Sequence, residues 1–229
     1  MTVGAYDIPY EDRLVTGPTI EPLDLEEVKK QRRFAATSLD TLFDTWVSAA
    51  RQAFEEETQL QLLTATRVFL LDECPASNVI MVSRGPVQLI SAVTYIDGDG
   101  VEQTFDAANY AVIPPVAVVD TYPQPGGIQL VSGSSWPSLD SRTQAMRIEY
   151  VAGFGAAPGD VPEIIKYAVM QYVGSFHRQG EETTDKQVYT LPLGAQMVIR
   201  EAKGHMKRTV FPRRSATAVA LLAATSVYP

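Results

Sequence analysis

The sequence predicts an α+β fold in which N-terminal and C-terminal helices form a small helical bundle, with a β-rich insertion between the second and third helices. Three observations favour this class. Apolar residues recur at three- and four-residue steps over 39–54 and again over 164–176, which is the period of an amphipathic helix. Between these stretches, short runs rich in β-branched and aromatic residues alternate with turn residues, as is typical of antiparallel strands.

The N-terminal part divides into an arm and two helices. Residues 1–22 are rich in Gly, Pro and acids and are expected to form an extended N-terminal arm. Asp24, with Glu27 three residues later, fits the N-cap of a first helix that runs to about Phe34. A second helix carries the first apolar stripe. We therefore assign residues 23–60 to the N-terminal helices of the bundle.

The β-rich insertion is assigned to residues 61–151. Its strongest turn signal is Asp97-Gly98-Asp99-Gly100, because Asp-Gly supplies the positive φ that a tight hairpin turn requires. Calcium binding by Asp97 and Asp99 is disfavoured, because a calcium loop needs more ligands and flanking helices. Seven runs are expected to be strands: Thr64–Leu71, Val79–Val82, Leu89–Ile96, Glu102–Phe105, Tyr110–Ile113, Gly127–Val131 and Met146–Val151.

A Gly- and Pro-rich stretch, Gly153–Gly159, is predicted to connect the last strand tightly to a third helix. A phosphate-binding loop is the alternative. It lacks the Gly-Lys-Ser/Thr signature, and Pro158 stands where a Gly-x-Gly-x-x-Gly pattern needs glycine. Asp160 is expected to cap the third helix, with Pro162 in its first turn.

The C-terminal region contains a further helix and a tail. A shorter helix is expected at about 194–207, so that residues 152–207 supply the C-terminal helices of the bundle. Residues 208–229 mix Pro, basic and small apolar residues and are expected to form an extended tail, disordered or ordered by a partner. The longest apolar run, Ala218–Ala224, is far shorter than the roughly 20 residues that a membrane span needs.

The charge is acidic and unevenly distributed. With a formal net charge of −8, the whole surface is not expected to bind DNA tightly, because such binding needs Lys and Arg to displace counterions. The densest acid run is Glu55-Glu56-Glu57. A basic segment, where Glu201 is the only acid between positions 200 and 214, comprises Arg200, Lys203, Lys207, Arg208, Arg213 and Arg214. This asymmetry favours docking on an acidic partner or another copy; a solvated helix face is the alternative.

The motifs do not assemble a catalytic or metal site. His177 and His205 lack partners at metal-ligand spacing, and Cys74 is the single cysteine, which leaves no disulfide or zinc pair. The acids next to Cys74 would raise the pKa of its thiol and disfavour a nucleophile. We therefore expect no catalytic residue, no metal and no cofactor. The competing interpretation is a small-molecule enzyme built from scattered residues: Asp97, Asp99, His177 and Glu181.

The order of segments resembles the small head–tail connector (adaptor, or head-completion) proteins of long-tailed phages and phage-derived gene-transfer agents. The resemblance runs from roughly Pro22 through the third helix. It rests on packing and turn elements: the Leu23–Arg33 and Trp46–Phe54 helices, the Val93–Val101 hairpin, Trp136-Pro137, and Ala152-Gly153-Phe154 before Val161-Pro162. The long arm and the extra tail after Val210 depart from the shorter members of the family.

The resemblance implies a structural, non-enzymatic virion protein at the head–tail neck, assembled in the host cytoplasm. It would form a homo-oligomeric ring, typically dodecameric, beneath the portal protein, join the DNA-filled head to a downstream neck or tail protein such as a stopper, and continue the DNA channel. Double-stranded DNA would pass without sequence-specific binding, and no membrane is involved. The family's C-terminal segment reaches the portal, so the six basic residues are candidate portal-binding residues. Glu55, Glu56 and Glu57 are candidate intersubunit or channel acids.

Two alternatives remain open at this point. Another neck or tail-completion protein, a stopper or tail terminator, is expected to be smaller and mostly β, whereas two strong helices precede the strands here. A DNA-binding regulator would use the basic segment 200–214 and show salt-sensitive DNA affinity.

Overall fold

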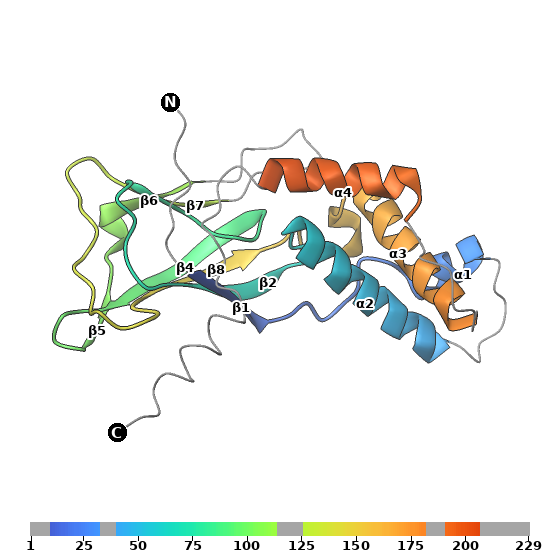
Figure 1. Cartoon of the computed structure of the whole chain (residues 1–229), viewed down its shortest axis with the longest axis horizontal. Coiled ribbons are helices and arrows are strands. Elements are labelled where there is room, and N and C mark those ends of the chain that lie inside the picture. The colour runs from blue at the N-terminus through green and yellow to red at the C-terminus, as the bar shows by residue number, and fades with distance from the viewer. Residues whose placement is uncertain (1–9, 33–39, 114–125, 182–190, 207–229) are drawn as a thin grey trace, which may run out of the picture.

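The computed structural model describes residues 10–32, 40–113, 126–181 and 191–206. Helices gather at one end of the molecule and strands at the other (Figure 1). The helices are α1 (Leu25–Arg32), α2 (Asp40–Thr58), α3 (Glu163–Glu181) and α4 (Leu193–Met206). The strands are β1 (Tyr10–Thr16), β2 (Ala65–Leu71), β3 (Val79–Met81), β4 (Val87–Ile96), β5 (Glu102–Thr104), β6 (Tyr110–Ile113), β7 (Gly127–Leu130) and β8 (Met146–Ala152). This mixture agrees with the predicted α+β class.

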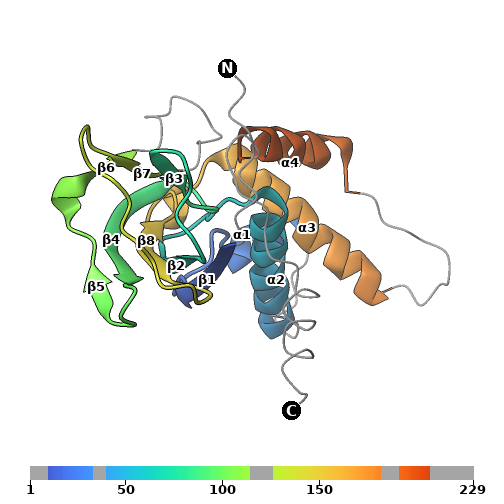
Figure 2. The same cartoon turned by 60° about the vertical axis from the view of Figure 1, so that its left-hand side comes forward.

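The helices pack through the apolar stripes that the sequence predicts. On α2, Phe43, Val47, Ala50 and Phe54 are buried, and they face α3 and α4. The amide of Glu26 donates to the Asp24 carboxylate at 2.7 Å, so the expected N-cap of the first helix is confirmed. In Figure 2, α4 lies above α2 and α3. These helices enclose one apolar core, to which α4 contributes Ala195, Val198, Ile199 and Ala202.

The strands form two antiparallel sheets. The larger has the order β1-β2-β8-β4-β5, and the smaller has the order β3-β7-β6. All seven predicted strands are present, with ends within two residues of those expected. The predicted hairpin joins β4 to β5: Gly100 has φ +80°, and the Asp97 carboxylate accepts from the amides of Asp99 and Val101, each at 3.0 Å. Both sheets share a second core, which includes Phe69, Ile80, Ile128, Ile148 and Tyr150.

Two local expectations differ from the structure. Residues 1–22 were expected to form an arm, yet β1 lies within them and pairs with β2 as an edge strand. Asp160 does not cap α3, which begins at Glu163. It belongs instead to a short 3-10 turn, Pro158–Asp160, and its carboxylate accepts from the Ala157 amide at 2.9 Å.

The third helix is also longer than expected. Its last residue is Glu181, five residues beyond the end of the apolar stripe at position 176. The helix expected at 194–207 is present as α4 and agrees within one residue at each end. The predicted tail, 208–229, lies outside the described residues.

Candidate functional site

The predicted acid run lies at the C-terminal end of α2, where the three glutamates take different environments. Glu55 is buried, and Arg51, one turn earlier, donates to its carboxylate at 3.0 Å. The other oxygen accepts from the Gln61 side chain at 3.0 Å and from the Leu62 amide at 2.9 Å. Burial raises the pKa of Glu55, although Arg51 and the Leu62 amide act in the opposite direction. In this chain Glu55 is therefore occupied by intramolecular partners.

The other two glutamates are more accessible. The guanidinium of Arg84 binds both the Glu55 carbonyl and the Glu56 carboxylate. Glu57 accepts from the hydroxyl of Tyr172 on α3 and, at 2.7 Å, from the ammonium of Lys203 on α4. Burial alone would raise the pKa of Glu57, but these two donors outweigh it and lower the pKa. An intersubunit or channel role for the three acids stays a prediction.

A second group of buried polar side chains lies on the larger sheet. Arg67, on β2, donates to the Asp12 carboxylate of β1 at 2.7 Å and to the Gln61 side chain at 3.1 Å. The other Asp12 oxygen accepts from the hydroxyls of Ser83 and Tyr150. Tyr150 is buried, and burial together with the Asp12 charge raises its pKa well above the ordinary value, so it serves as a hydroxyl donor.

Gln61 connects the two parts into one continuous network. We call this network the polar junction, because it lies where the helical core meets the strand core. At its outer end Arg51 donates to Glu21 at 2.7 and 3.2 Å. The backbone continues the connection: the Gln61 amide donates to the Gly85 carbonyl at 2.7 Å, and the Thr64 amide donates to the Gly155 carbonyl at 2.9 Å. The residues of the polar junction are Asp12, Glu21, Arg51, Glu55, Gln61, Arg67, Ser83, Arg84 and Tyr150.

Sequence reasoning did not identify this junction. Its partners are far apart in the chain: Asp12 and Arg67 are separated by 55 positions, and Asp12 and Tyr150 by 138. Two local signals were present. Arg67 interrupts an otherwise apolar β2 strand, and Arg51 stands four residues before Glu55, the spacing of a helical ion pair.

Two of the six predicted portal-binding residues lie in the described part of the chain. Arg200 is exposed on α4, and Lys203 is half-buried in its ion pair with Glu57. An acid of α2 and a base of α4 thus meet within one chain, whereas the sequence suggested contact between copies. The remaining predicted portal-binding residues lie outside the described part of the chain: Lys207, Arg208, Arg213 and Arg214.

The glycine-rich connection is a strand-to-helix turn, as predicted. Gly153 has φ +137°, and a Cβ on it would lie 2.6 Å from the carbonyl carbon of Leu63. A side chain at Gly155 would collide with the Asp160 carboxylate. Asp160 therefore places a negative charge within the loop, where a phosphate group would need positive charge.

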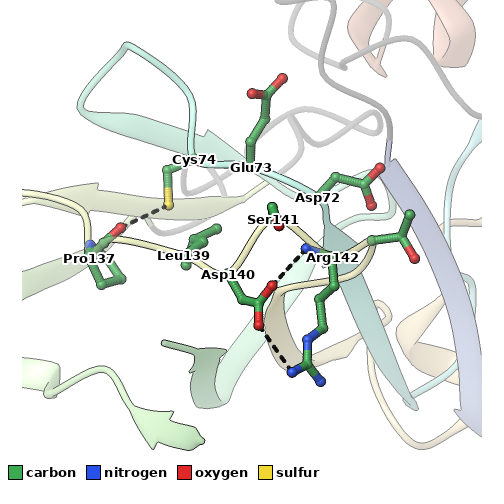
Figure 3. Close-up of a pocket in the computed structure, with 9 residues that line it drawn as sticks. Asp72, Glu73, Cys74, Pro137, Leu139, Asp140, Ser141 and Arg142 are labelled. Atoms are coloured by element: carbon green, nitrogen blue, oxygen red, sulfur yellow. Dashed lines mark hydrogen bonds and ion pairs between the residues drawn. The ribbon is translucent and has the colours of Figure 1, made fainter. Parts of the chain in front are cut away.

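A depression of about 470 Å³ lies beside Cys74, between the end of β2 and residues 137–143 (Figure 3). The thiol is half-buried, 3.9 Å from the Pro137 carbonyl oxygen and 3.7 Å from the Met146 sulfur. Burial, with a smaller contribution from Glu73, raises the pKa of Cys74 to about 11, so the thiol is protonated at neutral pH. On the opposite wall, Arg142 pairs with Asp140 (Figure 3).

The structure describes the side chains of some of the scattered residues in the enzyme interpretation. Asp97 uses its carboxylate to hold the hairpin turn and also accepts from Gln103 at 2.9 Å, which lowers its pKa. The side chains of His177 and Glu181 lie outside what the structure describes. Among the described residues, no group of three or more His, Cys, Asp or Glu side chains is arranged to hold a metal ion. None of the helices in the described ranges combines the length and apolar character that a membrane crossing requires.

Comparison with known proteins gives a likeness in fold. No family model and no curated protein matches the chain. A chain in the neck of an empty gene transfer agent (GTA) particle, computed with C6 symmetry, matches with 20% identity and a TM-score of 0.68, over 88% of this chain and 97% of that one. A chain in the virion of a native GTA particle matches with 20% identity and a TM-score of 0.67, over 88% and 96%. A chain in the neck of a native GTA particle, computed with C12 symmetry, matches with 22% identity and a TM-score of 0.65, over 88% and 97%.

Proposed function

We propose that this chain is a structural subunit of a virion neck: an adaptor that forms a ring beneath the portal, joins the DNA-filled head to the neck or tail, and continues the DNA channel. The observation that carries the proposal is the fold match to chains of GTA necks, which covers 88% of this chain and 97% of the matched chain. A match of this extent spans most of both chains rather than one common motif.

Two further observations support a ring. The matched neck structures were computed with C6 and C12 symmetry, as closed cyclic assemblies require. The net charge of −8 per chain gives a ring of twelve on the order of a hundred negative charges, a field that repels DNA phosphates from a channel wall. An acidic subunit thus suits a passage through which DNA must slide.

The proposal assigns no chemical reaction to the chain. The carboxylates of Glu55, Asp12 and Asp97 are held by intramolecular donors, and Cys74 is a protonated thiol. Glu55 and Asp12 stabilise the polar junction, and Asp97 stabilises the hairpin turn. Cys74 packs against the core of the sheets. A stopper or tail terminator is the nearest alternative, and it would occupy a different level of the same neck.

The test is assembly with the cognate portal, followed by electron microscopy and mass photometry. We expect the full chain to add a ring to the portal, and a chain lacking 207–229 to keep its fold but lose portal binding. Truncation after Met206 spares α4, whose Ala195 and Val198 lie in the helical core. A chain that ignores the portal but binds a tail-side protein would favour the stopper or terminator. Salt-sensitive binding to free DNA would favour a regulator.

A matched pair of charge variants sharpens the experiment. Arg213→Glu combined with Arg214→Glu should weaken portal binding if the basic segment docks there. Arg142→Glu combined with Arg147→Glu, at two half-exposed arginines of the β part, makes the same change of charge elsewhere and should leave binding unchanged. Equal binding by both variants would contradict the role assigned to the basic segment.

A further inference from the structure

Helices α3 and α4 carry a second apolar face that is open to solvent. We call it the helix patch, and it consists of Ile164, Tyr167, Leu193 and Met197, with exposed fractions of 47, 46, 74 and 60%. The two helices meet at this point, because a Cβ built on Gly194 would lie 3.9 Å from the Tyr167 ring. Contiguous exposed apolar side chains on a protein surface mark contact sites for partners.

The helix patch is not the face that holds the bundle together. On α3 the buried stripe includes Ile165, Ala168 and Val169, and on α4 it includes Ala195 and Val198. An amphipathic helix of a free-standing bundle needs one such stripe, with polar residues opposite it. The four side chains of the helix patch are therefore surplus to the fold of the single chain.

A second exposed apolar site lies on the edge strand β1. We call it the strand patch, and it consists of Leu14 and Val15, exposed by 52 and 53%. The register with β2 shifts between Leu14 and Thr16, so that Val15 has no opposite residue on β2, whereas Leu14 lies opposite Arg67. Edge strands with exposed apolar residues pair readily with other chains. In both views α4 lies along the top of the molecule and β1 well below it (Figures 1 and 2).

We propose that the helix patch of one copy packs against the strand patch of the next copy in the ring; this inference rests on the proposed function. Cyclic assembly of identical chains requires two different surfaces of each chain, because every contact is head to tail. The helix patch and the strand patch lie on different elements of the chain and are both apolar. In an incomplete ring only the two end copies would keep a free patch, and closure of the ring would cover both.

The size of the patches explains how such a ring would assemble. A specific, stable interface buries roughly 800 Å² per partner. The four side chains of the helix patch and the two of the strand patch bury less area than this when they meet. Free chains are therefore expected to stay monomeric. On a portal, neighbouring copies are held side by side at a local concentration on the order of millimolar, and a weak contact is then sufficient. Ring formation thus depends on the portal.

The first test introduces charge into each patch. Met197→Asp and Leu14→Asp should bind the portal as scattered copies without a closed ring, whereas Leu89→Asp, at a 56% exposed leucine on β4, should form rings like the natural chain. Thermal unfolding checks that all three variants fold. Closed rings of Met197→Asp or Leu14→Asp would overturn the inference alone. A natural chain that forms no ring on the portal would overturn the proposed function, and this inference with it.

The second test identifies the contact directly. In a Cys74→Ser background, Met197→Cys combined with Leu14→Cys should give a ladder of covalent multimers when portal-bound chains are treated with a short bis-maleimide. A single-cysteine chain can be linked at most into a dimer. Because the proposed contact joins one position of each kind, each single-cysteine variant should stay monomeric. Portal-bound rings that yield no ladder from the double-cysteine chain would overturn the pairing of the two patches.

Discussion

Replacing Arg67 by methionine should destabilise the chain strongly, because Arg67 stands at the centre of the polar junction. Its guanidinium is buried and donates to Asp12 at 2.7 Å and to Gln61 at 3.1 Å. Removing one partner of a buried ion pair leaves an uncompensated charge and costs about 3–5 kcal/mol. Ser83 and Tyr150 still donate to Asp12, so we expect the lower half of this range.

The assay is equilibrium unfolding in urea, with calorimetry to follow the midpoint. In a chain of this size, 1 kcal/mol shifts the midpoint by about 2–4 °C, so Arg67→Met should lower it by roughly 10 °C. Arg147→Met is the matched control. Arg147 lies on neighbouring β8, is half-exposed and pairs with Glu149 at 3.3 Å, and such surface pairs contribute about 0–1 kcal/mol.

A double variant separates the charge from the loss of volume. Asp12→Asn removes the stranded charge but keeps an oxygen that accepts from Ser83 and Tyr150. Adding it to Arg67→Met should therefore recover on the order of 1–3 kcal/mol. The role given to Arg67 is refuted if Arg67→Met lowers the free energy of unfolding no more than Arg147→Met does. It is also refuted if Asp12→Asn makes the Arg67→Met chain still less stable.

Three further predictions concern single sites. The folded-state pKa of Glu57 lies below its unfolded value, so its bond with Lys203 stabilises fully above about pH 4.3 and is lost as the pH falls through the folded pKa. Lys203→Met should therefore lower the urea midpoint at pH 7, and the difference from the natural chain should shrink progressively as the pH is lowered. Gly153→Ala should lower the free energy of unfolding by more than about 2 kcal/mol, because φ at this position is +137° and the new Cβ would clash with backbone atoms. Gly159→Ala is the control: a Cβ there meets open space, so this change should leave the free energy of unfolding, measured in urea, nearly the same. Cys74, with a pKa of about 11, should react slowly with iodoacetamide at pH 8 and much faster in urea, as followed by mass spectrometry; equal rates would show that burial does not control the thiol.

Periodicity predicted the elements whose stability depends on one apolar face. The stripe of α2 and the short runs from β2 to β8 each reveal their buried side through local sequence, so seven strands and four helices could be placed. Strand β1 was missed because its sequence, Tyr-Glu-Asp-Arg-Leu-Val-Thr, is charged, and an edge strand can form with little apolar burial. Asp160 was misassigned because a short acidic side chain can cap a helix or close its own loop, and the sequence does not distinguish the two.

The candidate site was predicted less well than the fold. Composition drew attention to Glu55, Glu56 and Glu57 as a solvent-facing or intersubunit run. The structure places Glu55 inside and ties Glu57 to Lys203, because Arg51, Gln61 and α4 converge on the end of α2. Apart from the four-residue spacing of Arg51 and Glu55, this convergence depends on tertiary packing, which spacing along the chain does not record.

The polar junction has a mechanical consequence. The charged hydrogen bonds of Arg67 and Glu55 are directional and weaken steeply when their angles change, so they add a directional constraint to the close packing of the two apolar cores. The helical end and the strand end should therefore move as one rigid unit. In the proposed ring, every copy would then present its surfaces to its neighbours at the same angle. Softening the junction would let that angle vary from copy to copy, even though every residue involved lies inside a single subunit.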